Sequence, residues 1–260
     1  MPGDMIKVSE DFWNIRGSYK IGGVIDVGTH VSLVRRANGR FVFLDAYTLS
    51  ASVQAEIDDL TDGGEKVEAI LNLHPFHTLH VRKMQKRFPR ARLYGTARHL
   101  ARFPELPWEE DHTEDAALHE RYGGDFDFSV PRGVDFISAN EKVHFSSVLA
   151  LHRASATIHS DDTLMYIRMP AVMRLFGMSD AVGFHPTLVK ALEKRAGAVR
   201  DFREWAEELI ENWSGAKNLC AAHTAVLLEG ENRGPAIQDR LRKALEKVDH
   251  TLQTHERKYG

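Results

Sequence analysis

Three histidines fall in one short stretch of the chain, where a predicted strand ends and a predicted helix begins. Residues 70–80 read Ile-Leu-Asn-Leu-His-Pro-Phe-His-Thr-Leu-His, so histidines stand at 74, 77 and 80. Imidazole nitrogens are common ligands of zinc and iron, and residues three apart lie on one side of a helical turn. We therefore predict that His77 and His80 face one ion and that His74 joins them from the loop.

An alternative for this stretch is a cap on the helix that packs against the core. Residues 70–80 contain no cysteine and no carboxylate. The partial positive charge at a helix N-terminus nevertheless favours neutral histidine, which is the form that binds a metal ion. Both interpretations stay open at this point.

A second group of polar residues lies between residues 151 and 164. His152 ends one predicted strand, and Asp161 and Asp162 come just before another. A carboxylate can bridge two divalent ions or orient a bound water, so these acids are candidate catalytic residues and Asp161 is also a candidate ligand. Asp161 is preferred because it is nearer to the end of the histidine strand. Ser-Asp-Asp-Thr is also ordinary turn sequence, so one of the acids is expected only to form the turn.

A third candidate, His223, follows the short apolar strand predicted for 218–222. A single histidine after a buried strand is more often structural than catalytic. The order of the three groups along the chain, each after a strand, is what favours a common site.

The elements that must position these residues begin with a hairpin. Asn38-Gly39 lies between the β-branched and aromatic runs 31–36 and 40–45, a strong hairpin signal. Helical spacing of apolar residues predicts a helix over 50–60 with Ser50 as its cap. The pattern continues with a strand at 67–71, a helix at 81–88 and a strand at 91–95. This alternation is typical of helices layered on a mixed sheet.

The second half of the chain opens with a long loop. Residues 103–133 are rich in proline, glycine and acids, with a short helix expected near 115–122. The remaining patterns predict strands at 135–137, 142–145, 147–151 and 164–167, helices at 188–194 and 201–213, and a terminal helix at about 234–250.

Composition limits the classes of function. The 260 residues are 43% hydrophobic and 27% charged, with 34 basic and 37 acidic residues and a net charge of -3. We therefore expect one globular domain over 1–260. The chain has no overall positive charge that would attract nucleic acid or an anionic membrane, so binding of a polyanion would need a local basic patch. The single cysteine excludes a disulfide framework and a cysteine-rich zinc site. No signal-like or membrane-spanning run is found, and a cytoplasmic location is expected.

In these residues and their order, the chain resembles the metallo-β-lactamase fold superfamily over roughly residues 20–230. The segments that carry the resemblance are 28–35, Asp45, 74–80, 88–95, 151–162 and 222–223. The resemblance implies an α/β fold, a four-layer αβ/βα sandwich with one or two metal ions at the sheet edge. It also implies a divalent metal, with zinc as the first expectation and iron or manganese as alternatives.

The sequence departs from the superfamily's typical motif, His-x-His-x-Asp-His. If His77 and His80 take the second and last histidine places, Pro75 and Leu79 replace the first histidine and the aspartate; if His74 is first, Phe76 replaces the second histidine. Either way the aspartate is absent, and in the superfamily it serves the second metal and the attacking water. The step from His152 to Asp161 is also shorter than usual. A mononuclear site, or one that has lost its metal, is predicted.

The resulting expectation is a metal-dependent hydrolase that acts on a small molecule. Its ion would be held by His74, His77, His80, His152, His223 and Asp161, with Asp161 or Asp162 orienting the water. The alternative is a metal-free protein of the same fold that acts as a binding or interaction module.

Overall fold

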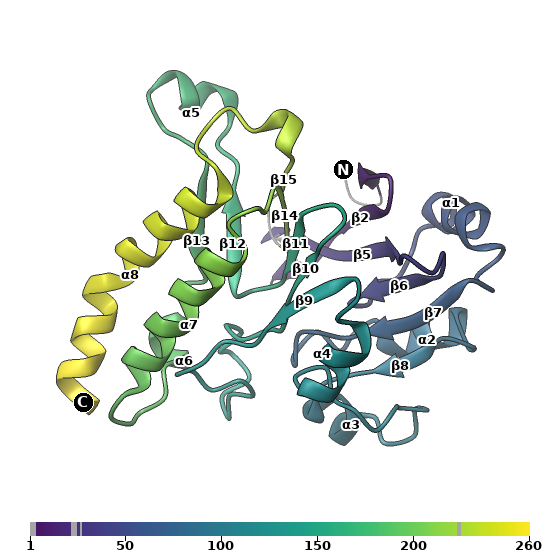
Figure 1. Cartoon of the computed structure of the whole chain (residues 1–260), viewed down its shortest axis with the longest axis horizontal. Helices are drawn as coiled ribbons and strands as arrows, with labels where there is room; N and C mark the ends of the chain where they lie inside the picture. Colours follow the sequence, from purple (N-terminus) through teal and green to yellow (C-terminus); the bar gives the residue numbers. More distant parts are fainter. Residues whose placement is uncertain (1–3, 22–24, 27, 223–224) are drawn as a thin grey trace. The chain divides into compact units, whose positions relative to one another are not determined.

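A computed structural model describes residues 4–21, 25–26, 28–222 and 225–260 (Figure 1). The chain divides into two compact units. The first unit is Met1–Phe128 with His152–Ser155, and the second is Ser129–Leu151 with Ala156–Gly260. Among the residues described, no helix is long and apolar enough to cross a membrane.

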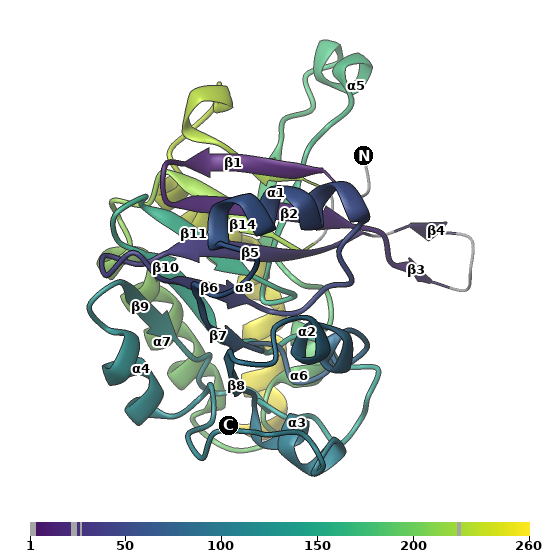
Figure 2. The same ribbon diagram turned by 90° about the vertical axis from the view of Figure 1, so that its right-hand side faces the viewer.

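The first unit carries a six-stranded sheet with the order β1-β2-β5-β6-β7-β8 (Figure 2). Its strands are β1 (Met5–Ser9), β2 (Phe12–Gly17), β5 (Thr29–Arg35), β6 (Phe41–Leu44), β7 (Val67–Leu71) and β8 (Arg92–Tyr94). The predicted hairpin is confirmed: β5 and β6 are antiparallel, with Leu33 opposite Phe43. Strands β6, β7 and β8 are parallel to one another. A small separate hairpin joins β3 (Lys20–Ile21) to β4 (Ile25–Asp26).

Helices cover one face of this sheet. The first unit contains α1 (Ala51–Thr61), α2 (Val81–Arg87), α3 (Ala97–Arg102) and α4 (Ala116–Tyr122). Ser50 caps α1 as predicted, since its hydroxyl accepts a hydrogen bond from the N–H of Val53. Ile57 of α1 and Met84 of α2 pack in one cluster with Leu33 and Phe43 of the sheet. Burial of these apolar faces is what holds the helices on the strands.

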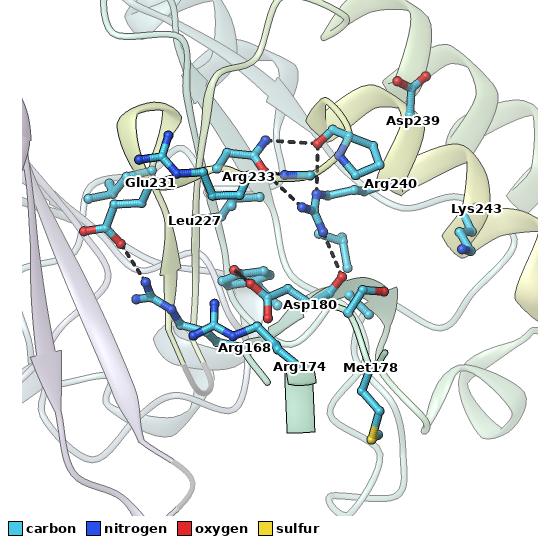
Figure 3. Close-up of a pocket in the computed structure, with 18 of the residues that line it drawn as sticks. Arg168, Arg174, Met178, Asp180, Leu227, Glu231, Arg233, Asp239, Arg240 and Lys243 are labelled. Carbon is cyan, nitrogen blue, oxygen red and sulfur yellow. Dashed lines mark hydrogen bonds and ion pairs between the residues drawn. The ribbon is translucent and has the colours of Figure 1, made fainter. Parts of the chain in front are cut away.

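A second sheet has the order β15-β14-β11-β10-β9; β11, β14 and β15 belong to the second unit, whereas Phe126–Phe128 of β9 and His152 of β10 belong to the first. Its strands are β9 (Phe126–Ser129), β10 (Leu149–His152), β11 (Thr157–Ser160), β14 (Asn218–Ala221) and β15 (Val226–Leu227). Strands β12 (Leu164–Ile167) and β13 (Ala181–Phe184) form a separate antiparallel hairpin. The helices are α5 (Ala171–Leu175), α6 (Leu188–Ala191), α7 (Ala198–Asn212), the short 3₁₀ helix η1 (Glu229–Glu231) and α8 (Ile237–Tyr259). A cavity is lined by the β12–β13 hairpin, η1 and the start of α8 (Figure 3).

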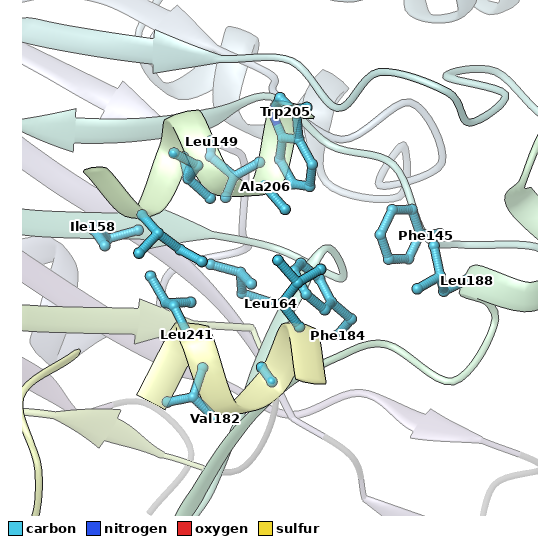
Figure 4. Close-up of a cluster of buried hydrophobic side chains, with 14 of the residues drawn as sticks. Phe145, Leu149, Ile158, Leu164, Val182, Phe184, Leu188, Trp205, Ala206 and Leu241 are labelled. Atoms are coloured by element: carbon cyan, nitrogen blue, oxygen red, sulfur yellow. The ribbon is translucent and has the colours of Figure 1, made fainter. Parts of the chain in front are cut away.

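The core of the second unit lies where α7 and α8 meet the strands (Figure 4). Phe202 and Trp205 of α7 are 5.4 Å apart between ring centroids, and Phe184 of β13 is 5.3 Å from Phe202. Ile158 of β11 and Leu241 of α8 belong to the same cluster. Aromatic pairs at these separations add to the free energy gained by burying apolar area.

The strands predicted at 135–137 and 142–145 are wrong. Residues 130–148 are irregular, apart from an isolated bridge between Val134 and Leu192. Val143 and Phe145 are both buried in the core. The alternation of apolar and polar residues at 142–145 therefore comes from two side chains that anchor a loop, and not from a strand. Gly133 has φ of 70°, and a Cβ there would lie 2.0 Å from the carbonyl oxygen of Ala198. The close approach of α7 therefore requires glycine at this position.

Candidate metal centre

The first histidine group follows β7, at the edge where the parallel strands of the first unit end. Asp45 comes directly after β6 with φ of 69° and is only 2% exposed. Its Oδ1 accepts hydrogen bonds from the backbone N–H groups of Leu73 at 2.8 Å and His74 at 3.4 Å. These bonds fix the path of the chain as it leaves β7, and therefore the position of His74.

His74 is completely buried, and its ring stacks on that of His77. The ring centroids are 4.0 Å apart and the planes differ by 17°. The N–H of Phe76 donates to Nδ1 of His74 at 3.1 Å, so in this arrangement a neutral ring carries its proton on Nε2. Binding of an ion through Nε2 therefore requires the other neutral tautomer, in which this hydrogen bond is given up.

His99 of α3 completes this cluster and was not predicted. Its Nε2 is 3.5 Å from the carbonyl oxygen of His77, and its Nδ1 is 2.9 Å from Oγ1 of Thr96. Burial disfavours the imidazolium and lowers the pKa of His99 to about 4, so the ring is neutral at physiological pH. The one signal in the sequence is Thr96, because a threonine three residues before a polar side chain is typical of a helix start.

His80 makes other contacts. It is the cap residue of α2, which begins at Val81, so His77 and His80 do not share a helical turn as the sequence predicted. Nδ1 of His80 is 2.8 Å from Oγ1 of Thr48, and its ring centroid lies 4.8 Å from that of Tyr47. Burial lowers the pKa of His80, and the charge of Lys83 lowers it further.

His152 ends β10 and is also buried in the first unit. Its Nδ1 is 2.8 Å from Oγ of Ser155, and its ring centroid lies 5.4 Å from Phe126 and 5.9 Å from Phe12. Burial lowers the pKa of His152, so that its neutral form dominates. His223 lies outside the described residues.

The acids of the second unit follow β11 directly. Asp161 and Asp162 are 1% and 3% exposed. Strand β11 pairs in parallel with β14, with His159 opposite Cys220. Because side chains alternate along a strand, His159 and Asp161 lie on the sheet face opposite Ile158, which packs in the helical core.

His144 lies beside Asp162 and is a residue that the sequence reasoning missed. Its Nδ1 is 3.9 Å from Oδ2 of Asp162. Two hydrogen bonds tie the neighbouring loop to the residue after Asp162: the N–H of Ser147 donates to Oγ1 of Thr163 at 3.0 Å, and Thr163 donates to the carbonyl of Phe145 at 2.8 Å. In the sequence, His144 lies between the apolar residues Val143 and Phe145, and this alternation predicts a strand.

Metal-ligating side chains are therefore present in both units. Residues that offer a ligand atom are His30 and His74 in the first unit, and His144, His159, Asp161 and Asp162 in the second. His30 and His159 are further residues that the sequence reasoning did not select; His30 Nδ1 is 3.0 Å from the side-chain amide of Asn14. Imidazole and carboxylate donors suit zinc and other divalent ions.

Solved structures of metallo-β-lactamases resemble this chain over nearly its whole length. The metallo-β-lactamase from Pontibacter korlensis is 12% identical, with a TM-score of 0.58 over 96% of this chain and 98% of that one. FIM-1 from Pseudomonas aeruginosa, in its mono-zinc form, is 10% identical, with a TM-score of 0.57 over 95% and 96%. The metallo-β-lactamase from Erythrobacter litoralis is 10% identical, with a TM-score of 0.59 over 94% and 96%.

These similarities establish the fold. The chain has the mixed α/β fold of the metallo-β-lactamases, as the sequence resemblance implied. No family model and no curated protein matches the chain.

Proposed function

We propose that this protein is a metal-dependent hydrolase that uses a single divalent ion, zinc first, with iron or manganese as alternatives. The observation that carries the proposal is the pair of buried acids after β11, with His144 next to Asp162, on the fold of the metallo-β-lactamases. Buried carboxylates beside an imidazole are a donor set that suits a divalent ion, so their place at a strand end favours a metal ligand. The mono-zinc form of FIM-1 supports a single ion.

The residues that would hold the ion come from the groups already described. In the first unit the foremost candidate is His74, with His77, His80 and His152 as further candidates. In the second unit they are His144, Asp161 and Asp162, and His223 remains a candidate from the sequence. When bound, such an ion lowers the pKa of a coordinated water to about 7 and polarises a carbonyl or phosphoryl oxygen.

The chain's own side chains would then manage the proton and the water. Whichever of Asp161 and Asp162 faces the water would orient it and accept its proton, because an ionised carboxylate only accepts hydrogen bonds. Neutral histidines keep a lone pair for the ion, and burial of His99 and His152 favours neutral rings in the first unit. We propose a small-molecule substrate and a cytoplasmic location, with no nucleic-acid or membrane substrate.

Metal content tests this proposal. Protein purified without a histidine tag is loaded with zinc, dialysed and analysed by elemental mass spectrometry, and about one ion per chain is expected. The variants His74→Ala and Asp162→Asn are each expected to lose the ion. Glu211→Gln, an exposed acid on α7, serves as the control and should keep it. Zinc far below one ion per chain, or unchanged zinc in both variants, would contradict the proposal.

The second candidate function is a metal-free binding module. If His74 is the first histidine of the superfamily motif, Phe76 takes the place of the second, and its ring is 4.5 Å from the guanidinium carbon of Arg98. If His77 and His80 are instead the second and last histidines, Leu79 takes the place of the aspartate, and it is 68% exposed. A chelator distinguishes the two functions: it should lower the melting temperature at pH 7.5 if an ion is bound, and less so at pH 5, because protons compete for the histidines below about 6.5. A melting temperature that responds to neither chelator nor zinc favours the binding module.

A further inference from the structure

The second unit contains a cavity of about 260 Å³ that none of the candidate metal ligands lines (Figure 3). Its walls come from the β12–β13 hairpin on one side and from η1 and the start of α8 on the other. Six of the lining residues are basic: Arg168, Arg174, Arg233, Arg240, Lys243 and Lys247. Three are acidic, which leaves an excess of three positive charges in a chain whose net charge is -3.

Arg240 is the buried member of this group. It is 8% exposed, and its guanidinium donates to three neutral oxygens: the carbonyls of Asp180 at 2.8 Å and Pro235 at 3.0 Å, and Oδ1 of Asn232 at 2.9 Å. Within the described ranges no carboxylate forms an ion pair with it. A buried cation with only neutral acceptors is costly to maintain, and an anion in the cavity would stabilise it.

Gly234 leaves room for the guanidinium of Arg240. A Cβ on Gly234 would lie 2.4 Å from Nη2 of Arg240, so a larger residue there would require the guanidinium to shift. The three hydrogen bonds to neutral oxygens hold the charge in place before a ligand arrives, which reduces the entropy lost on binding.

The acids of the cavity leave most of the positive charge uncompensated. Glu231 pairs with Arg168 at 2.9 Å. The side chains of Arg174, Arg233, Lys243 and Lys247 form no hydrogen bond or ion pair within the part of the chain that the structure describes. The carboxylate of Asp180 already accepts hydrogen bonds from the hydroxyl of Tyr166 at 2.9 Å and the N–H of Met169 at 2.8 Å. Partial burial raises the pKa of Asp180, but these bonds and the nearby arginines lower it more, so this acid is ionised.

We propose that this cavity is a binding site for a small anionic ligand that carries a phosphate group. A phosphate presents several charged oxygens and accepts bidentate hydrogen bonds from guanidinium groups, so it can engage Arg174 and Arg233 together with the exposed edge of Arg240. A carboxylate offers only two oxygens and one charge. The site does not depend on the metal-dependent activity proposed above, because it shares no residue with it.

The same phosphate chemistry has two sources, a soluble phosphate ester and the headgroup of an anionic lipid. Between β12 and β13 the chain exposes five large apolar side chains, of which Val172 (63%), Leu175 (86%) and Phe176 (81%) are the most exposed. These side chains would enter a membrane surface only in the second case. The experiment therefore includes both sources.

Isothermal titration calorimetry with inorganic phosphate, pyrophosphate and acetate tests the soluble source. We expect the phosphates to bind more tightly than acetate, and Arg174→Ala and Arg233→Ala each to weaken phosphate binding about 10-fold. Arg257→Ala, an exposed arginine on α8 outside the cavity, is the matched control and should have no effect. Asp162→Asn should also leave phosphate affinity unchanged, which separates this cavity from a metal centre.

Co-sedimentation with vesicles tests the lipid source. If the protein binds phosphatidylcholine vesicles that contain phosphatidic acid, and both Arg174→Ala and Leu175→Ser lose this binding, the ligand is a lipid headgroup. If the protein binds phosphate but not the vesicles, the ligand is a soluble phosphate ester. Absence of all binding, acetate binding more tightly than phosphate, or equal losses in Arg257→Ala and the cavity variants would overturn the proposal. Arg174 and Arg233 make no contacts that the fold needs, so unchanged melting temperatures are expected to show that the variants are folded.

Discussion

Nδ1 of His144 lies 3.9 Å from Oδ2 of Asp162 in the second unit. The loop that carries His144 has no strand pairing of its own and is held by the hydrogen bonds around Thr163. The hydrogen bonds around Thr163, and not strand pairing, therefore hold the loop that places His144 beside the buried carboxylate of Asp162.

This relationship predicts a role for His144 in metal binding. His144→Gln keeps a polar side chain of similar length but removes the imidazole, and zinc affinity is expected to fall about 10- to 100-fold. Competition titration against a chromophoric chelator measures it. His250→Gln, an exposed histidine on α8, is the control. Equal zinc affinity in the two variants would exclude His144 as a ligand.

The pKa of His99 predicts how stability depends on pH. Because the folded state holds this pKa at about 4 and the unfolded chain has about 6.5, the unfolded state binds more protons between these values. The contribution of His99 to stability is therefore complete above pH 6.5 and is lost as the pH falls towards 4, by roughly 3 kcal/mol at most. Urea unfolding of the wild type and His99→Gln at pH 7 and pH 5 measures it. A variant that loses as much stability as the wild type over this range would show that His99 does not cause the dependence.

Asp45 is expected to be essential for the turn that carries His74. Asp45→Ala removes the acceptor of two backbone N–H groups and places alanine at φ of 69°, so the free energy of unfolding should fall by roughly 3 kcal/mol. Asp45→Asn should cost less, because asparagine tolerates a positive φ and keeps one acceptor oxygen. Chemical denaturation compares the two variants. Similar losses for alanine and asparagine would indicate that neither backbone strain nor the acceptor matters.

The ion pairs of Arg36 should stabilise the first unit. Its guanidinium binds both carboxylate oxygens of Glu68, at 2.7 and 2.8 Å, and Oδ2 of Asp125 at 2.8 Å, and all three side chains are mostly buried. Arg36→Met removes the closest cation from two buried carboxylates and leaves Glu68 with its longer pairs to Arg40 and Arg92, so it should cost about 3 kcal/mol in the free energy of unfolding.

The adjacent Arg35 provides the comparison for Arg36. It pairs with Asp11 in a half-exposed position, so Arg35→Met should cost less than about 1 kcal/mol. Comparable losses in the two variants would mean that burial does not determine the value of these pairs.

The sequence predicted the fold better than the site. Where local signals and packing agree, as in the Asn38-Gly39 turn or the Ser50 cap, the predicted elements are present. The resemblance to metallo-β-lactamases correctly indicated the fold. The sheet begins with β1 and β2, however, which were not predicted; α3 was also not predicted, and β9 lies within the segment that the sequence predicts to be a long loop.

The details of the site depend on contacts that are distant in sequence. His77 and His80 have helical spacing, but α2 starts after them, so their rings contact different partners. His99 and His144 carry no motif; one is placed by its contact with the carbonyl of His77, and the other by a loop bound to Thr163. Such placements follow from tertiary hydrogen bonds, which spacing along the chain does not encode.

The contact between Gly234 and Arg240 has a consequence for reading other sequences. A Cβ at 234 would lie 2.4 Å from Nη2 of Arg240, so a chain with a larger residue at 234 must hold this guanidinium elsewhere, whereas glycine is compatible with any residue at 240. In chains of this fold, a glycine six positions ahead of an arginine at the start of the last long helix is therefore expected where the buried charge is kept. A chain with the arginine but without the glycine should have the charge in another position, whatever its metal ligands are.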